Sequence, residues 1–191
     1  MTINGFRLIS LEKFRFVLEP RYFMQGWATT SGILGRDSAV IALLKARLLL
    51  PAGYNFKIWD MHRSREVQIR MIISFRDRIR SEHPGLSELA VMRQVYRYAA
   101  KARRVVRRPD CHRNGGAVDL TVVDSCGLEL DMGTDHDDLT EKAAFGYFGN
   151  LKRKTSAEAR VAENRELLKQ AMEAAGFDGL PREWWHWSTV Q

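Results

Sequence analysis

The sequence of 191 residues lacks several features that would place a protein in a class at once. Its longest apolar stretch is interrupted by Lys45 and Arg47, so nothing approaches the roughly 20 residues that span a bilayer. Two cysteines are too few for a disulfide scaffold, and Cys111 and Cys126 are either free thiols or one bridge. There is no internal repeat, low-complexity segment or Ser/Gly linker. We therefore expect a single domain over residues 1–191.

The N-terminal sequence also lacks an apolar stretch behind a basic one, which argues against a signal peptide. We accordingly expect a cytoplasmic protein. An apolar content of 45% and a charged content of 28% are ordinary for a globular chain.

Positive charge is in excess. Lys and Arg outnumber Asp and Glu by 30 to 23, a net charge of +7 that favours anionic partners such as nucleic acid, anionic lipid or a carboxylate substrate. The basic run 101–108 is typical of a solvated helix face. No nucleic-acid motif or interleaved aromatic residues accompany it, so no nucleic-acid partner is expected.

Apolar periodicity and turn residues predict helices before most of the strands. The predicted helices cover 37–50, with Asp37 as N-cap, 65–81, 86–106 and 156–175, the last opened by a Thr155–Glu158 capping box. The predicted strands cover 54–60, 117–123, 128–132 and 182–190, with a hairpin turn at 124–127. This order predicts an α+β fold, in which helices cover an antiparallel sheet.

Two short stretches carry residues suited to metal chemistry. His112 lies on a glycine turn before Asp119, and His186 follows near the C-terminus. Two imidazoles and a carboxylate can hold a catalytic zinc ion with one position left to water, and Glu183 could accept the proton of that water. The spacing of His112 and Asp119 can also arise by chance, and the tryptophans beside His186 are also typical of a core strand. Spacing alone therefore leaves both the metal site and this purely structural interpretation open.

The motifs together resemble the zinc D-alanyl-D-alanine dipeptidases of the vancomycin-resistance type, over roughly residues 38–188. That family carries Ser-x-His-x-x-Gly-x-Ala-x-Asp and, later, Glu-x-Trp-His. The sequence has "DCHRNGGAVD", "LDMGTDHDDL" and "EWWH" in the same order, and "IWDMHRS" resembles an upstream strand end of the family. The first 30 residues match poorly.

The resemblance implies one Zn²⁺ per chain and a role for each matching residue. His112, Asp119 and His186 would be the ligands and Glu183 the general base and acid. Arg63 would stabilise the oxyanion, and Asp137 would hold the ammonium group of a small dipeptide. Cys111, next to His112, and His136, next to Asp137, are not expected to be metal ligands.

The main departure from the family pattern is Asp110, which stands where the family has serine. An extra acid beside the metal site is expected to contact substrate. It leaves open a carboxypeptidase or endopeptidase acting on wall peptides. Two further alternatives are a nucleic-acid-binding module with a zinc site and a zinc-binding relative without turnover.

Overall fold

The computed structural model describes residues 1–104, 108 and 110–189. Within this part, the main sheet has five strands in the order β3-β5-β6-β8-β7. They are β3 (Val17–Leu18), β5 (Asn55–Asp60), β6 (Ala117–Val123), β7 (Phe177–Leu180) and β8 (Glu183–Thr189). All neighbours are antiparallel except β3 and β5, which are parallel. The predicted α+β class is confirmed.

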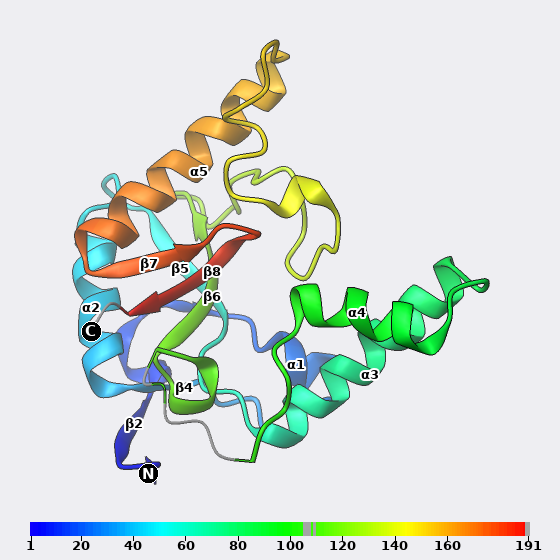
Figure 1. Cartoon of the computed structure of the whole chain (residues 1–191). Coiled ribbons are helices and arrows are strands. Elements are labelled where there is room, and N and C mark those ends of the chain that lie inside the picture. Colours follow the sequence, from blue (N-terminus) through cyan, green and yellow to red (C-terminus); the bar gives the residue numbers. More distant parts are fainter. Residues whose placement is uncertain (105–107, 109, 190–191) are drawn as a thin grey trace.

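Helices cover both faces of this sheet (Figure 1). One face packs on α2 (Asp37–Leu48) and α5 (Ser156–Ala174) through the main core, where Leu43, Leu120 and Leu168 are fully buried. On the other side lie α1 (Arg21–Met24), α3 (Arg65–Glu82) and α4 (Glu88–Tyr98). They share a second, smaller core, whose buried residues include Tyr22, Phe75 and Val95.

Local sequence explains where the longer helices begin. Ser64 caps α3 by accepting a hydrogen bond from the Val67 N–H, and Thr155 and Glu158 form the predicted capping box of α5. At α2 the prediction was wrong by one residue. Arg36 is the N-cap, and Asp37 is the first helical residue, where a carboxylate still interacts favourably with the helix dipole.

The N-terminal segment forms structure that the sequence did not predict. β1 (Thr2–Ile3), β2 (Phe6–Ser10) and β4 (Leu34–Arg36) make a small antiparallel sheet, and the 3-10 helix η1 (Leu11–Phe14) directly follows β2. The expected order of helices before strands is therefore wrong. These strands are too short to show a clear alternation of apolar and polar residues.

Two other predictions need correction. The helix predicted over 86–106 ends at Tyr98, and the described residues that follow are irregular; residues 105–106 lie outside the described part. The strand predicted over 128–132 is reduced to one bridge between Val123 and Glu129. The turn itself is present, because Asp124 accepts hydrogen bonds from the Cys126 and Leu128 N–H groups. Both cysteines are free thiols.

Among the described residues, no helix combines the length and the apolar character that crossing a bilayer requires.

Candidate metal centre and active site

Three side chains from separate elements meet at one end of the main sheet. His112 begins the 3-10 helix η2 (His112–Asn114), Asp119 lies on β6 and His186 on β8. Antiparallel pairing of β6 and β8 places Asp119 directly opposite His186. The turn after η2 needs glycine, because Gly115 has a φ of +67° and a Cβ there would lie 2.7 Å from the Arg36 nitrogen. The fold thus brings the three predicted ligands together.

The potential ligand atoms form a nearly equilateral triangle. His112 Nε2 lies 3.1 Å from His186 Nδ1 and 3.2 Å from Asp119 Oδ1, and His186 Nδ1 lies 3.0 Å from the same oxygen. Tetrahedral bonds of about 2.0–2.1 Å to zinc imply ligand separations of roughly 3.3 Å. These residues therefore fit a zinc ion, and the three are the candidate ligand group of the described chain.

The other nitrogen of each imidazole has an acceptor. His112 Nδ1 lies 2.8 Å from the Met61 carbonyl oxygen, and His186 Nε2 lies 3.2 Å from Ser188 Oγ. If these nitrogens carry the protons, each ring directs a lone pair at the centre of the triangle. Such support of the non-ligating nitrogen is a general feature of histidine metal sites.

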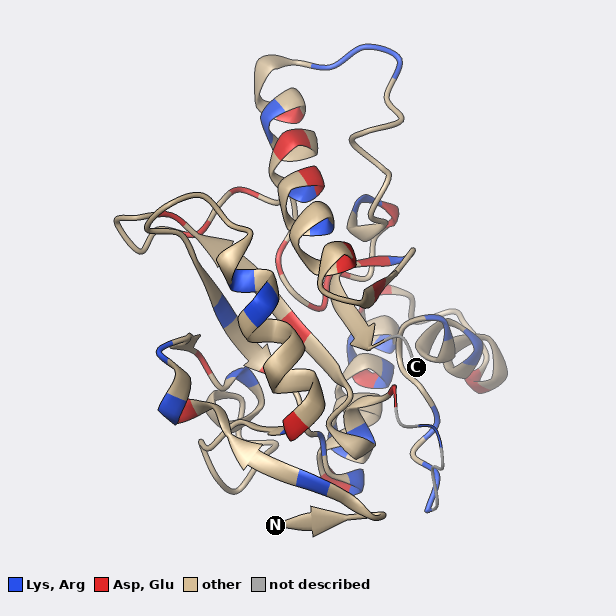
Figure 2. Cartoon of the chain, turned by 90° about the vertical axis from the view of Figure 1, so that its left-hand side faces the viewer, with Lys and Arg blue, Asp and Glu red and all other residues tan. Residues whose placement is uncertain are grey.

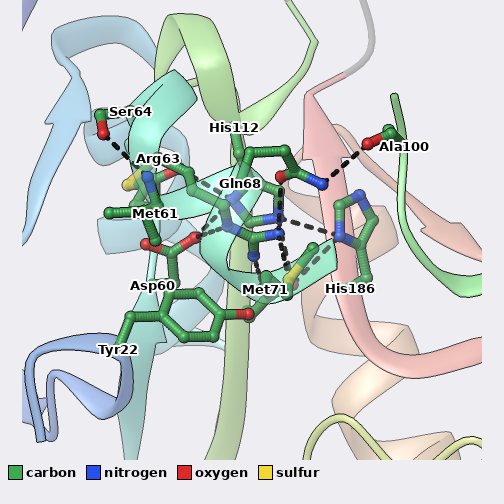
Figure 3. Close-up of polar contacts among 12 residues, drawn as sticks. Tyr22, Asp60, Met61, Arg63, Ser64, Gln68, Met71, Ala100, His112 and His186 are labelled. Carbon is green, nitrogen blue, oxygen red and sulfur yellow. Dashed lines mark hydrogen bonds and ion pairs between the residues drawn. The ribbon is translucent and has the colours of Figure 1, made fainter. Parts of the chain in front are cut away.

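Arg63 connects this group to a second carboxylate (Figure 3). Its Nη2 donates to Asp119 Oδ2 at 2.7 Å and its Nε donates to Asp60 Oδ2 at 2.8 Å. The Nη1 atom has weaker partners, Gln68 Oε1 and Met71 Sδ, both at 3.3 Å. Arg63 is thus held in the cleft by two buried acids, with one end of its guanidinium less strongly bound.

The close charges shift the protonation equilibria. Burial raises the pKa of Asp119, but the charge of His112 and hydrogen bonds from the histidines hold it well below the usual range. Burial lowers the pKa of His112, yet Asp119 outweighs this and raises it to about 9. Burial lowers the pKa of His186. In the absence of metal, Asp119 therefore remains a carboxylate that attracts positive charge.

The environment of Glu183, unlike that of Asp119, favours the neutral form of its carboxyl group. It lies at the start of β8 and lines the same cleft. Burial, followed by the negative charges of Asp119 and Asp137, raises its pKa to about 8. A carboxyl group whose pKa lies near neutrality can both accept and donate a proton, as general acid–base catalysis requires.

Asp137 lies at another side of the cleft, in a turn with a φ of +59°. Its Oδ2 accepts a hydrogen bond of 3.2 Å from Tyr22 Oη. Between Asp137 and Asp119 lies the buried ring of His136, with one nitrogen 3.6 Å from each carboxylate. His136 is a turn residue, as expected, but it fills the space behind the metal group.

Asp110 also lines the cleft, but its carboxylate is already engaged. Arg108 donates to it through Nε at 3.1 Å and Nη2 at 2.6 Å, and this hydrogen bonding lowers the pKa of Asp110. The predicted extra negative charge is thus compensated by a neighbour. Cys111 Sγ donates to the Arg108 carbonyl oxygen and is outside the candidate ligand group.

Sequence reasoning missed three residues of this site. Asp60 was part of the quoted "IWDMHRS" motif, and an acid three positions before a buried arginine could have been recognised as its partner. Tyr22 lies in the N-terminal segment that offered no motif. His136 gave no sign of burial, because its contacts with Trp59 and Trp185 are distant in sequence.

Comparison with known proteins places the chain in a family. The peptidase M15 model, described as D-ala-D-ala dipeptidase, matches residues 24–191. The chain belongs to this family, and the predicted relationship is confirmed.

Individual relatives agree with this assignment. A D-alanyl-D-alanine dipeptidase of Synechocystis sp. is 33% identical over 51% of this chain and 41% of its own length. One of Enterococcus faecalis is 26% identical over 83% of this chain and 74% of its own length. The match with the Synechocystis protein thus spans less than half of that relative.

A solved structure has a related fold. The vancomycin resistance D,D-pentapeptidase VanY, crystallised as a mutant in complex with Zn(II), superposes with a TM-score of 0.52 at 14% identity. The likeness covers 84% of this chain and 75% of that one.

Proposed function

We propose that this protein is a zinc dipeptidase that hydrolyses D-Ala-D-Ala, with one zinc ion held by His112, Asp119 and His186. The observation that carries the proposal is the triangle of ligand atoms at 3.0–3.2 Å, with Glu183 in the same cleft. Membership of the D-ala-D-ala dipeptidase family indicates the substrate class. The match with the D-alanyl-D-alanine dipeptidase of E. faecalis covers 83% of this chain.

Zinc, when bound, polarises the peptide carbonyl and activates water. Glu183 then accepts the proton of the attacking water and delivers it to the amine that leaves. Arg63 cannot lose its own proton at neutral pH, so the weakly bound Nη1 end of its guanidinium can donate to the developing oxyanion. The products are two D-alanine molecules.

Asp137 gives the reaction its preference for a free dipeptide. Its carboxylate, oriented by Tyr22, can pair with the ammonium group of the substrate. An acylated N-terminus has no charge to offer and would leave this partly buried acid unpaired. We expect Asp110 to contribute to substrate binding indirectly, because its carboxylate positions Arg108 at the rim of the cleft.

The test is release of D-alanine from D-Ala-D-Ala by the purified protein, with zinc and after treatment with a chelator. We expect turnover that the chelator abolishes and zinc restores. N-acetyl-D-Ala-D-Ala should be cleaved poorly. Lack of any chelator-sensitive release would refute the proposal, whereas preference for the acetylated peptide would indicate a carboxypeptidase instead.

A further inference from the structure

The cleft is larger than a dipeptide of two alanines requires. Its volume is about 1070 Å³. Pockets that bury whole drug-sized ligands generally measure about 300–1,000 Å³. The space beyond the metal group is therefore available to a larger substrate residue.

Charge is unequally distributed around this space. We use "metal wall" for the lining residues Arg63, His112, Asp119 and His186. We use "cationic wall" for the lining residues Arg65, Lys101, Arg103, Arg108 and Arg113. In Figure 2 the connection that follows α4 and leads into the grey trace carries Lys and Arg on its described part.

Two arginines of the cationic wall, Arg65 and Arg113, are half-buried and form no ion pair within the described part of the chain. Arg65 Nε donates to the Ala102 carbonyl oxygen at 3.1 Å, which holds the side chain in place. Arg113 Nε is buried without a hydrogen-bond acceptor. The pKa of the exposed Glu66 is lowered mainly by hydrogen bonds from its own backbone and from Ser64, and to a smaller extent by the charges of Arg113 and Arg65. Among the described residues, no carboxylate forms an ion pair with either arginine. Arg108 differs, because Asp110 neutralises it.

The two ends of the cleft have opposite chemistry. Tyr22, which binds Asp137, and Ala100, which leads into the cationic wall, lie on different sides of His112 and His186 in Figure 3. A dipeptide with its ammonium group at Asp137 and its carbonyl at the metal wall would direct its second residue to the cationic wall. One main-chain carboxylate can occupy one guanidinium, which leaves the other for a second acid.

We propose that the preferred substrates are D,D-dipeptides whose C-terminal residue carries a side-chain carboxylate, so that Arg65 and Arg113 together bind its main-chain and side-chain carboxylates. The inference rests on the proposed dipeptidase function and narrows its substrate class. A planar guanidinium pairs with a carboxylate through two parallel hydrogen bonds, and a neutral amide of the same shape cannot replace that charge.

The experiment compares D-Ala-D-Glu with D-Ala-D-Gln, which differ by one charged group, on the zinc-loaded protein. We expect kcat/KM to be about tenfold higher for D-Ala-D-Glu, since a hydrogen bond to a charged group is worth roughly that factor or more. The ratio should fall toward one at high salt. It should also fall toward one in the R65Q/R113Q double variant. In R65K/R113K it should fall to an intermediate value, because a point charge replaces the two-bond fork of the guanidinium. It should remain high in the control R160Q, on the exposed side of α5.

Thermal unfolding of each variant checks that it is folded, and a general loss of activity affects both substrates and cancels in the ratio. A ratio near one in the wild type, with D-Ala-D-Ala still cleaved, would overturn this inference and leave the proposed function intact. If no dipeptide is cleaved, the affinities of the two peptides for the zinc-loaded Glu183→Gln variant are measured by calorimetry, and their comparison tests the cationic site. Tighter binding of D-Ala-D-Glu supports the cationic site, and equal affinity overturns it.

Discussion

The metal wall and the cationic wall face the same cleft, but their charges are balanced in different ways. In the metal wall, the side chains of Arg63 and Asp119 are only 8% and 2% exposed and form a 2.7 Å ion pair. In the cationic wall, the Arg108 side chain is 78% exposed, although its ion pair with Asp110 is just as short. Buried charges must be compensated within the protein, whereas water compensates exposed ones. Equal distances therefore do not mean equal energetic importance.

The largest expected effect is that of Asp119→Asn, which keeps the shape and removes the charge shared by Arg63, His112 and His186. With metal absent, we expect the free energy of unfolding to fall by about 3 kcal/mol, because a buried ion pair loses one partner. Zinc binding should weaken as well. Urea unfolding with a chelator measures the first effect and zinc titration the second.

The matched control is Asp178→Asn, an exposed acid that lines the same cleft. It should change the stability by less than about 0.5 kcal/mol. Equal effects of the two substitutions would contradict the contrast between buried and exposed charges.

Glu183→Gln tests catalysis without touching the ligand group. We expect kcat/KM for D-Ala-D-Ala to drop by about 10²–10⁴-fold, the usual contribution of a general base. Zinc should still bind, because His112, Asp119 and His186 are unchanged. Steady-state kinetics and metal analysis give both results, with the exposed Glu163→Gln as control. A nearly unchanged rate would remove Glu183 from the mechanism.

The raised pKa of Glu183 also predicts a pH-dependent stability difference in the metal-free protein. Because the folded-state pKa is about 8 and the usual value is 4.5, the folded protein holds this proton more tightly. The contribution of Glu183 to the free energy of unfolding is therefore fully present below about pH 4.5 and is lost as the pH rises through 8. Glu183→Gln cannot ionise, so its melting temperature should increasingly exceed that of the wild type between pH 5 and pH 9.

Both proteins contain the other titrating groups, so the difference between them reports Glu183 together with its electrostatic interaction with His112. Melting temperatures measured in a chelator across this range provide the check. A constant difference would mean that Glu183 is not held in a desolvated, negatively charged environment.

The smallest effect is expected for Arg108→Gln. Although the substitution breaks two short hydrogen bonds to Asp110, solvent screens the exposed pair, and the free energy of unfolding should change by less than about 0.5 kcal/mol. Urea unfolding measures it. A loss comparable to that of Asp119→Asn would show that the cationic wall is a structural network after all.

Much of this architecture could be predicted from local patterns. The capping box at Thr155 and the position of β5 depend on neighbouring residues and were predicted to within about a residue. The helix expected to reach residue 106 instead ends at Tyr98, although the residues beyond favour helix by their composition. Propensity is a weak prior that tertiary context overrides. The strand expected at 128–132 is reduced to one bridge, because its backbone pairing with β6 and the turn is limited to the hydrogen bonds of Leu128 and Leu130 on either side of Glu129.

The candidate ligands are recognisable in sequence because metal chemistry restricts both residue type and spacing. His112, Gly115 and Asp119 fall within one turn and strand, and Glu183 and His186 within another, so each half of the site is encoded locally. Only the tertiary structure joins the halves, through the pairing of Asp119 with His186 across β6 and β8. It also adds Tyr22, Asp60 and His136, whose roles depend on burial and on neighbours far away in the chain. Charge balance in a low-dielectric site is set by three-dimensional proximity, which no local pattern specifies.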